Sequence, residues 1–419
     1  MSTAKEICVV GGGVIGLCTA YYAMKQGHRV TVIERGGPAH DSCSLGNAGM
    51  IVPSHFIPLA APGMVALGAK MMLRPRSPFY VRPRPDADLI RWGALFAKSA
   101  TAAHVANSAP ILRDLHLASR ARYQELARDL GDDFGFTKNG LLMLCKTQSA
   151  LQEEAHTAEM ACKLGMEAKV LTPLETARVD PEITMDIAGS VYFPQDGHLT
   201  PQIFIERLTK ALEAGGVSFL WGAEVTGWGT ASGRIVSART DAGEVAADEY
   251  VLAGGAWSPR TVRDLGIRLP MQAGKGYSLT LPKPPQTPRV CSILMEARVA
   301  VTPMLSGLRI GGTMEVTGLD LSISWPRVDG ILESVPKYFP RFAPGDFENV
   351  PVWSGLRPCS PDGMPYVGRF DRYRNLIAAT GHAMMGISLG PATGEILADI
   401  LSDHAPKIDI GALSPDRFH

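Results

Sequence analysis

The sequence predicts an α/β protein with a second domain of the α+β type, and three observations support this prediction. Residues 7–34 read as a strand, a glycine-rich turn, a helix and a second strand. Residues 250–258 and 376–401 each place small residues between a buried strand and the start of a helix. Residues 270–314 contain strands broken by glycine and proline with no long helix between them, which predicts a mostly antiparallel sheet.

The length and charge of the chain narrow its class. At 419 residues it exceeds one ordinary hydrophobic core, so we expect two domains. Hydrophobic residues make up 46% and charged residues 20%, which is typical of a globular protein. Lysine plus arginine and aspartate plus glutamate both number 41, so the formal net charge is zero and we expect no nucleic-acid partner.

Cysteine usage and the N-terminus indicate the compartment. The 7 cysteines are scattered and form no CxxC pair, which argues for reduced thiols and against a disulfide framework or a metal site. The first residues lack the basic and then apolar pattern of a secretory signal. No apolar run approaches the roughly 20 residues of a membrane-spanning helix. We therefore expect a cytoplasmic protein without a metal centre.

The first predicted turn carries the pattern G-x-G-x-x-G at Gly11, Gly13 and Gly16. Gly11 permits the tight turn, Gly13 lets the backbone approach a pyrophosphate, and Gly16 lets the helix pack closely on the strands. The free N–H groups at the start of the helix favour an anion. Glu34 ends the second strand, where a carboxylate accepts hydrogen bonds from ribose hydroxyls. These features predict a βαβ unit that binds a dinucleotide.

The segment after this unit favours FAD over NAD. Glu34 is followed by Arg35 and then by a loop rich in serine and glycine at residues 42–49. Such a loop suits a long ligand that continues beyond its diphosphate. The strand at 250–252 and the strand at 376–379 also end in small residues, which leave room for a ligand in the crevice at the ends of the strands.

Residues 61–73 form an apolar stretch in which Lys70 is the only charged residue, and Arg74 and Arg76 follow it. One interpretation is a helix that lies on a bilayer surface. The other is a lid or connector that packs on the core.

The remaining elements follow from hydrophobic period and from turn residues. Helices are predicted within 86–130 (two), at 149–164, from residue 173, at 201–214 and at 328–339. Strands are predicted at 140–145, 189–193 and 217–220, followed by a small meander to residue 245.

With these motifs in order, the chain resembles the FAD-dependent D-amino acid oxidase superfamily, and within it the bacterial D-amino acid dehydrogenase branch with its glycine oxidase and sarcosine oxidase relatives. The resemblance rests on the glycine motif and on SLGNAG (44–49), KGYS (275–278), RVAVT (298–302), GGTME (311–315), GLRP (355–358) with Asp362-Gly363, and TGH (380–382) with Gly386. It implies a Rossmann-like FAD-binding domain made of residues 1–55, 195–265 and 350–419. A mostly antiparallel-sheet substrate-binding domain would comprise 56–194 and 266–349.

The resemblance also implies site residues. Non-covalent FAD would be held by Gly11, Gly13, Val14, Ile15, Gly16, Glu34, Arg35, Ser42, Ser44, Asn47, Ala48, Gly49, Val225, Gly254, Trp257, Gly381, Met385, Gly386 and Ile387. Arg357, the arginine of the GLRP motif, would bind the substrate carboxylate through its planar fork. Tyr277 and His382 are the other two candidate catalytic residues.

The implied reaction is the oxidative deamination of a D-amino acid. The flavin N5 would accept a hydride from Cα, and the imino acid would be hydrolysed to a 2-oxo acid and ammonia. Met384 and Ala300 stand where glycine oxidases carry an arginine and a tyrosine, and Gly355 stands where sarcosine oxidases attach flavin to cysteine. Apolar residues around the pocket favour a cyclic D-imino acid such as D-proline or hydroxy-D-proline.

Several alternatives stay open at this stage. Electrons would pass to a quinone or another acceptor, with residues 61–73 as a peripheral contact at the inner face of the cell membrane. A glycine- or sarcosine-type amine oxidase would use oxygen instead. A flavoprotein subunit of a larger amine dehydrogenase complex is the third alternative. A pyridine-nucleotide dehydrogenase would need a second cofactor crevice, and a disulfide reductase would need a partner for Cys43; the sequence shows neither.

Overall fold

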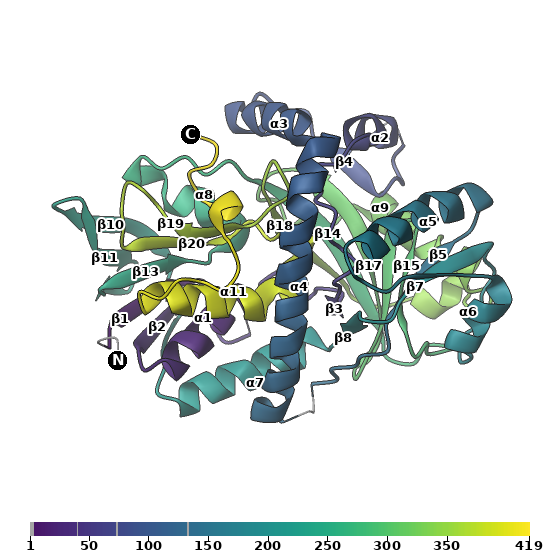
Figure 1. Cartoon of the computed structure of the whole chain (residues 1–419), viewed down its shortest axis with the longest axis horizontal. Helices are drawn as coiled ribbons and strands as arrows, with labels where there is room; N and C mark the ends of the chain where they lie inside the picture. The colour runs from purple at the N-terminus through teal and green to yellow at the C-terminus, as the bar shows by residue number, and fades with distance from the viewer. Residues whose placement is uncertain (1–3, 40, 73, 132–133) are drawn as a thin grey trace.

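Two sheets and a long helix organise the protein. The computed structural model describes residues 4–39, 41–72, 74–131 and 134–419. A six-stranded sheet and a nine-stranded sheet lie on either side of α4 (Ala102–Leu130), which stands between them in Figure 1. Leu73, the last residue of the predicted apolar stretch, lies outside the described residues.

The six-stranded sheet is the Rossmann-like part, as the sequence predicts. Its strands run in the order β19 (Tyr366–Arg369), β20 (Leu376–Thr380), β13 (Glu249–Leu252), β1 (Glu6–Val10), β2 (Arg29–Glu34) and β9 (Ser218–Trp221). Neighbouring strands are parallel except for the edge pair of β19 and β20. A parallel sheet is covered on both faces, which explains the continuous apolar runs in β1 and β13.

The two covers of this sheet differ. Ile7 and Val9 of β1 pack in one core with residues of α1 (Val14–Lys25), α7 (Pro201–Ala214) and α11 (Gly386–Leu401). Cys8 and Val10 point to the other face and pack in a core with residues of the meander formed by β10 (Val225–Ala231), β11 (Arg234–Thr240) and β12 (Gly243–Ala246). Helices therefore cover one face, and the predicted antiparallel meander covers the other.

The nine-stranded sheet is mostly antiparallel. Its main path is β18 (Val352–Cys359), β14 (Gln272–Leu281), β17 (Gly307–Val316), β16 (Val299–Met304), β15 (Cys291–Leu294), β5 (Leu141–Cys145), β7 (Gly189–Phe193) and β6 (Lys169–Leu171), with β4 (Phe79–Val81) beside β17. The pairs β15–β5 and β17–β4 are parallel. β18 pairs with β14 although it falls within the stretch 350–419 expected for the FAD-binding domain, and the division of the chain into domains stays a prediction.

The remaining helices are α2 (Met64–Met72), α3 (Ala87–Ser99), α5 (Gln148–Lys163), α6 (Pro173–Val179), α8 (Ser258–Thr261), α9 (Trp325–Leu332) and α10 (Val335–Tyr338). Of these, α3, α5 and α6 begin at side-chain caps, formed by Asp86, Thr147 and Thr172. Thr172 and Glu175 form a capping box at the start of α6. The single helix predicted at 328–339 is wrong: α9 ends at Leu332, and Pro336, which has no N–H to donate, lies in the first turn of the separate helix α10.

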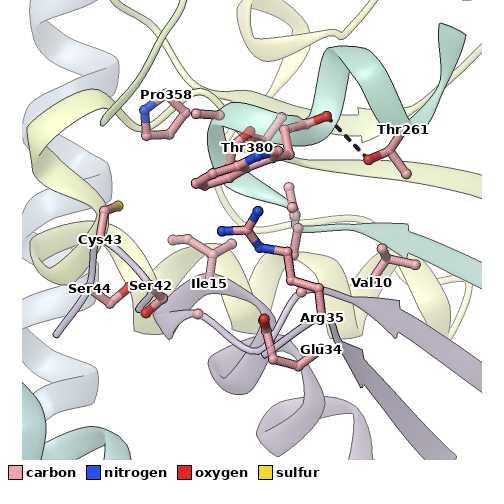
Figure 2. A pocket seen from close by; sticks show the side chains of 18 of the residues that line it. Val10, Ile15, Glu34, Arg35, Ser42, Cys43, Ser44, Thr261, Pro358 and Thr380 are labelled. Atoms are coloured by element: carbon pink, nitrogen blue, oxygen red, sulfur yellow. Dashed lines mark hydrogen bonds between the residues drawn. The ribbon is translucent and has the colours of Figure 1, made fainter. Parts of the chain in front are cut away.

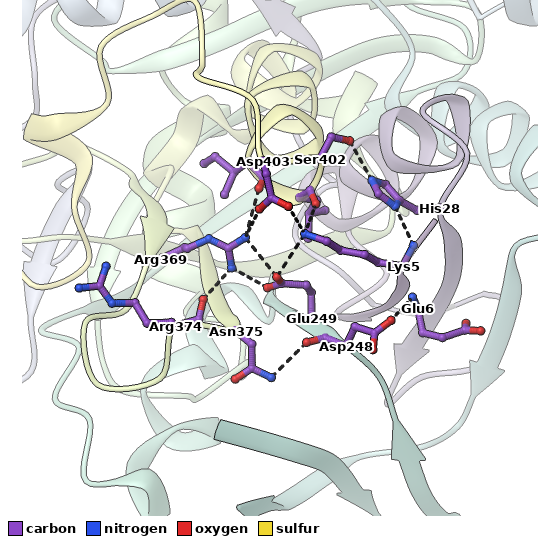
Figure 3. A network of polar contacts seen from close by, with 12 residues as sticks. Lys5, Glu6, His28, Asp248, Glu249, Arg369, Arg374, Asn375, Ser402 and Asp403 are labelled. Carbon is purple, nitrogen blue, oxygen red and sulfur yellow. Dashed lines mark hydrogen bonds and ion pairs between the residues drawn. The ribbon is translucent and has the colours of Figure 1, made fainter. Parts of the chain in front are cut away.

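A polar network closes the edge of the six-stranded sheet at which β1 and β13 begin (Figure 3). Glu249, only 7% exposed, accepts hydrogen bonds of 2.5 and 3.2 Å from the guanidinium of Arg369. Lys5 Nζ lies 3.6 Å from Glu249 and 2.8 Å from Asp403. These contacts join the first strand to the C-terminal part of the chain, so the opposite edge of the sheet is the one left for a ligand.

A second buried polar cluster lies beside the small ribbon of β3 (Met50–Ile51) and β8 (Gly197–His198). Asp196 is fully buried; its carboxylate accepts hydrogen bonds from the N–H and the hydroxyl of Ser54. The Ser54 hydroxyl is also 3.1 Å from Nδ1 of His55. Burial raises the pKa of Asp196 to about 8, against the hydrogen bonds of Ser54, which lower it. A protonated Asp196 therefore fits this site.

We predict that Asp196→Asn makes the stability of the protein less sensitive to a rise in pH. The carboxyl pKa is near 8 in the folded state and 3.8 in the unfolded state, so the wild-type free energy of unfolding falls as pH rises from about 4 to 8 and then levels. Asparagine has nearly the shape of the protonated carboxyl and does not titrate, so it makes no pH-dependent contribution to stability. Urea unfolding at pH 5 to 9 should show the variant gaining relative stability, by at most about 1.4 kcal/mol per pH unit.

Asp371→Asn, which removes an exposed carboxylate beside Arg374, is the control and should leave the pH profile unchanged. A constant difference between wild type and Asp196→Asn across this range would contradict the prediction.

Candidate functional site

A cleft of about 1010 Å³, part of it open to solvent, lies at the carboxyl ends of the parallel strands (Figure 2). Val10 of β1, Glu34 of β2, Ala253 after β13 and Thr380 of β20 all line it. The predicted residues that line it are Gly11, Gly13, Val14, Ile15, Glu34, Arg35, Ser42, Ser44, Val225, Gly254, Trp257, His382 and Gly386. The structure therefore gathers most of the predicted cofactor residues from distant segments into one cleft.

The glycine turn forms the floor of this cleft through two close backbone approaches. Gly11 has φ +116°, and a Cβ on it would lie 2.4 Å from the carbonyl oxygen of Ala253. A Cβ on Gly16 would lie 2.0 Å from the carbonyl oxygen of Gly11. Neither position tolerates a side chain, so the turn and the start of α1 depend on both glycines.

The first N–H groups of α1 have no acceptor within the helix, and the residues that carry them line the cleft. Gly13 is the N-cap residue and provides no side-chain acceptor. Ser44 supplies one from the neighbouring loop: its Oγ accepts a hydrogen bond of 3.1 Å from the N–H of Val14. Because unpaired N–H groups and the helix dipole favour negative charge here, this end of α1 suits a diphosphate.

Glu34 is fixed at the end of β2. It is 8% exposed, and its carboxylate accepts hydrogen bonds from the N–H of Gly12 at 2.8 Å and from the N–H of Gly36 at 2.9 Å. Both bonds hold the carboxylate in place at the cleft wall. A carboxylate has further lone pairs on each oxygen, so Glu34 can still accept hydroxyl donors from a ligand.

Arg35 and Trp257 form one end of the cleft. The guanidinium carbon of Arg35 lies 3.7 Å from the centroid of a Trp257 ring, and Nη2 is 3.3 Å from a carboxylate oxygen of Asp41. Figure 2 shows the Arg35 side chain reaching across the cleft from the end of β2. This pair provides two flat surfaces on which an aromatic ring system can stack.

Arg357 lies on β18 beside β14, outside the lining of this cleft. Its Nη1 donates a hydrogen bond of 2.6 Å to the carbonyl oxygen of Thr313. Among the described residues, no carboxylate lies within ion-pair distance of its guanidinium. A Cβ on Gly276 would lie 2.2 Å from both terminal nitrogens, so the absence of a side chain there makes room for Arg357.

His382 lines the cleft, but its imidazole is not charged at physiological pH. Its Nε2 is 3.0 Å from the hydroxyl of Thr393, and its Nδ1 has no hydrogen-bond partner within the described part of the chain. Burial lowers the pKa of His382 to about 3, so the imidazole is neutral at physiological pH. A neutral imidazole can orient a group or accept a hydrogen bond, but it is a poor proton donor.

Tyr277 is placed away from the cleft. It is 2% exposed, its hydroxyl donates to Glu315 at 3.1 Å and accepts from the N–H of Ser324 at 3.0 Å. Burial raises the pKa of its phenol. The hydroxyl is occupied by structural contacts, and the catalytic role of Tyr277 stays a prediction without support from its position.

Other predicted cofactor residues lie next to the cleft rather than on its lining. Asn47 donates to the carbonyl oxygen of Met384 at 3.2 Å and accepts from the N–H of Gly49 at 2.8 Å. Gly49 and Gly381 have φ of +70° and +80° and form turns. The remaining members of this group are Gly16, Ala48, Met385 and Ile387.

Sequence reasoning missed several lining residues. Cys43, Ala253, Gly255, Ala256 and Thr380 lie inside segments that the sequence singled out as loops at strand ends, so that signal could have found them. Glu224 and Thr261 line the cleft as well, and no local pattern distinguishes them.

A model of the FAD dependent oxidoreductase (DAO) family matches residues 6–400. The chain belongs to this family. It is 34% identical to a D-amino acid dehydrogenase of Granulibacter bethesdensis and 32% identical to one of Bradyrhizobium diazoefficiens, with 99% of each chain covered in both cases. A glycine oxidase structure from Geobacillus kaustophilus matches with a TM-score of 0.78 at 24% identity over 99% of each chain, which shows the same fold.

The predicted family and FAD dependence are thus confirmed, and the described residues of this FAD-dependent oxidoreductase fit the cofactor. The N-terminus of α1 would hold the diphosphate, and Glu34 would hold the ribose next to it. The cradle at Gly11 is one that a Cβ would fill. The roles of the individual residues remain predictions.

We predict that Gly11→Ala destabilises this oxidoreductase and prevents FAD binding. The added Cβ would clash with the carbonyl oxygen of Ala253, and the residue would keep a φ of +116° that alanine avoids. We expect a loss of about 2–4 kcal/mol in the free energy of unfolding of the apoprotein, measured in urea.

Gly37→Ala is the matched control, because Gly37 is exposed and a Cβ there meets no atom within 4 Å. If both variants unfold at the same urea concentration as wild type and bind FAD, the packing argument for Gly11 is wrong.

Proposed function

We propose that the protein is an FAD-dependent D-amino acid dehydrogenase that oxidises a D-amino acid to its imino acid, which water then hydrolyses to a 2-oxo acid and ammonia. The observation that carries this proposal is Arg357: a guanidinium beside the glycine-lined strand β14 with no carboxylate of the described residues paired to it. The 34% identical relative over 99% of both chains is named as a D-amino acid dehydrogenase, which supports the same substrate class.

The proposed division of labour follows from the residues. Arg357, which is half-buried, pairs its planar fork with the substrate carboxylate, because partial removal from water strengthens such a charge-assisted bond. Burial also lowers the pKa of Arg357, although an arginine stays charged at any physiological pH. FAD, when bound, supplies the acceptor for the hydride. The chain therefore has to orient the substrate, exclude water and leave its amine neutral.

Apolar side chains on β16, on β17 and in residues 383–385 favour an apolar or cyclic substrate in this proposal. Met314 packs with Cys359 and Ala383 in a small apolar cluster, and Ala300 is half-buried on β16. Met384 is 38% exposed, next to the carbonyl that binds Asn47. None of these side chains offers a second hydrogen bond to a substrate carboxylate or amine. We therefore propose a cyclic D-imino acid, such as D-proline or a hydroxy-D-proline, as the substrate.

The electron acceptor in this proposal is a membrane quinone, reached through α2. None of the residues of this helix is buried, Val65 is 51% exposed, and Lys70 is its only charged residue. Arg74 and Arg76, both exposed, follow it, and Arg76 forms an exposed ion pair of 2.8 Å with Glu333. Within the described residues, every helix is too short or too polar to span a bilayer. An apolar exposed helix flanked by basic residues suits the surface of an anionic membrane.

We predict that anaerobic addition of the correct D-amino acid bleaches the flavin, and that Arg357→Ala abolishes rapid bleaching. The substrates to compare are D-proline, cis-4-hydroxy-D-proline, D-alanine, glycine and sarcosine. Loss of two charge-assisted hydrogen bonds of about 1.5–3 kcal/mol each should lower kcat/KM on the order of 100- to 1,000-fold or more. Arg357→Lys should retain part of the activity.

Arg260→Ala removes an exposed arginine of α8 and should behave like wild type. Unchanged bleaching in Arg357→Ala would refute the role of Arg357. Bleaching by glycine or sarcosine with rapid oxygen consumption would establish the oxidase alternative. An FAD-loaded protein that none of the amines bleaches would favour a subunit of a larger complex.

We predict that the protein sediments with vesicles that contain anionic lipid and that Val65→Asp prevents this. The added carboxylate opposes both burial in the interface and attraction to the lipid charge. Val236→Asp is the matched control, because Val236 is 46% exposed on β11 of the meander. The membrane proposal would be contradicted if the wild-type protein did not sediment with the vesicles and did not reduce a ubiquinone analogue.

A further inference from the structure

The loop that follows the second strand is held from behind by the nine-stranded sheet. Ser42 and Ser44 line the cofactor cleft, and the next three residues turn their carbonyl groups toward β14 and β17. Nη1 of Arg309 donates hydrogen bonds of 2.9 Å to the carbonyl oxygens of Leu45 and Asn47. The hydroxyl of Ser278 donates one of 2.9 Å to the carbonyl oxygen of Gly46 between them.

Arg309 is a buried cation that donates hydrogen bonds to this loop. It is 4% exposed, and its Nε donates to the hydroxyl of Thr280 at 3.0 Å. No carboxylate in the described ranges lies within ion-pair distance of it. Burial lowers the pKa of Arg309 to about 10, so the side chain stays charged at neutral pH. A buried charge without an anion depends on hydrogen bonds for its stability, and the two loop carbonyls accept two of the three that Arg309 makes in the described part of the chain.

The front of the same loop touches the elements that surround the cofactor. Ser44 accepts the N–H of Val14 at the start of α1, and Asn47 donates to the carbonyl oxygen of Met384. A shift of the loop would therefore move the acceptor at the helix N-terminus and the contact to residues 383–385 together. The carbonyl anchors determine which side of the loop faces the cleft.

We infer that Arg309, assisted by Ser278, is a positioning residue for the cofactor: it holds residues 45–47 against the sheet so that Ser42 and Ser44 face FAD. The inference rests on the proposed FAD-binding roles of those serines. Arg309 acts through the loop and contacts neither the cleft lining nor Arg357. Its effect is therefore on the affinity and environment of FAD, whereas the effect of Arg357 is on the substrate.

The experiment compares FAD binding by four variants. Arg309→Met removes all the donors at similar length, Arg309→Lys retains one donor group, and Ser278→Ala removes only the bond to Gly46. Thr280→Val is the matched control, because it removes the partner of Nε and leaves the three loop carbonyls bound. The apoproteins are titrated with FAD by flavin fluorescence, their thermal unfolding is recorded, and the visible spectrum and kcat and KM of the loaded forms are measured.

Arg309→Met should raise the Kd for FAD about 10- to 100-fold, with Arg309→Lys intermediate and Ser278→Ala raised a few-fold. Thr280→Val should match wild type. The KM for the amine should stay constant in all four, and the absorbance bands of the bound flavin should shift in Arg309→Met. Arg357→Lys should instead keep the wild-type Kd for FAD and raise KM.

An unchanged Kd and spectrum in Arg309→Met and Ser278→Ala would overturn the inference, and Ser278→Ala alone decides it if Arg309→Met does not fold. A lower unfolding temperature with an unchanged Kd would also overturn it, because it shows a structural role only. A wild-type protein that binds FAD but bleaches with no amine would count against the proposed substrate and leave the Kd comparison valid.

Discussion

The structure depends on the approach of two backbone segments at the carboxyl edge of the parallel sheet. The turn after β1 comes so close to the carbonyl of Ala253, after β13, that Gly11 has no room for a Cβ. This contact brings the N-terminus of α1 to the mouth of the cleft and places Gly254 to Trp257 beside it. The ionic network around Glu249 holds the opposite edge of the same strands. The ionic network thus closes one edge of the sheet, and the backbone contact at the other edge shapes the cleft for a ligand.

The nine-stranded sheet uses two arginines in different ways. Side chains alternate along a strand, so Gly274, Gly276, Ser278 and Thr280 share one face of β14. Arg357 lies across from Gly274 and Arg309 across from Thr280, and both reach that face. Arg309 donates through Nη1 to two loop carbonyls and through Nε to the hydroxyl of Thr280, whereas Arg357 donates one hydrogen bond, to the carbonyl oxygen of Thr313, among the described residues. Arg357 therefore has more donors left in its fork to receive a carboxylate.

The sequence predicted best what is local. The glycine turn between β1 and α1, the end of β2 at Glu34 and the start of a helix at Pro173 depend on patterns within a few residues, and each lies where it was predicted. The partners of Arg309 are 262 and 264 residues away, and no spacing rule connects them. Tyr277 belongs to the KGYS motif, yet strand alternation turns it toward Glu315 and away from the cleft. Contacts between residues far apart in the chain decide where such side chains point, and a single sequence does not reveal those contacts.

The titratable groups around Arg357 constrain the chemistry that the chain can contribute. Burial raises the pKa of Cys43 to about 11, while the positive charge of Arg357 lowers it, and burial raises that of Cys359 to about 12. The imidazole of His382 stays uncharged down to about pH 3, because burial lowers its pKa. These three groups therefore keep one protonation state across the physiological range. Any pH dependence of substrate oxidation between pH 6 and 9 is then expected to arise from the amine itself, which must lose its proton before a hydride can leave Cα.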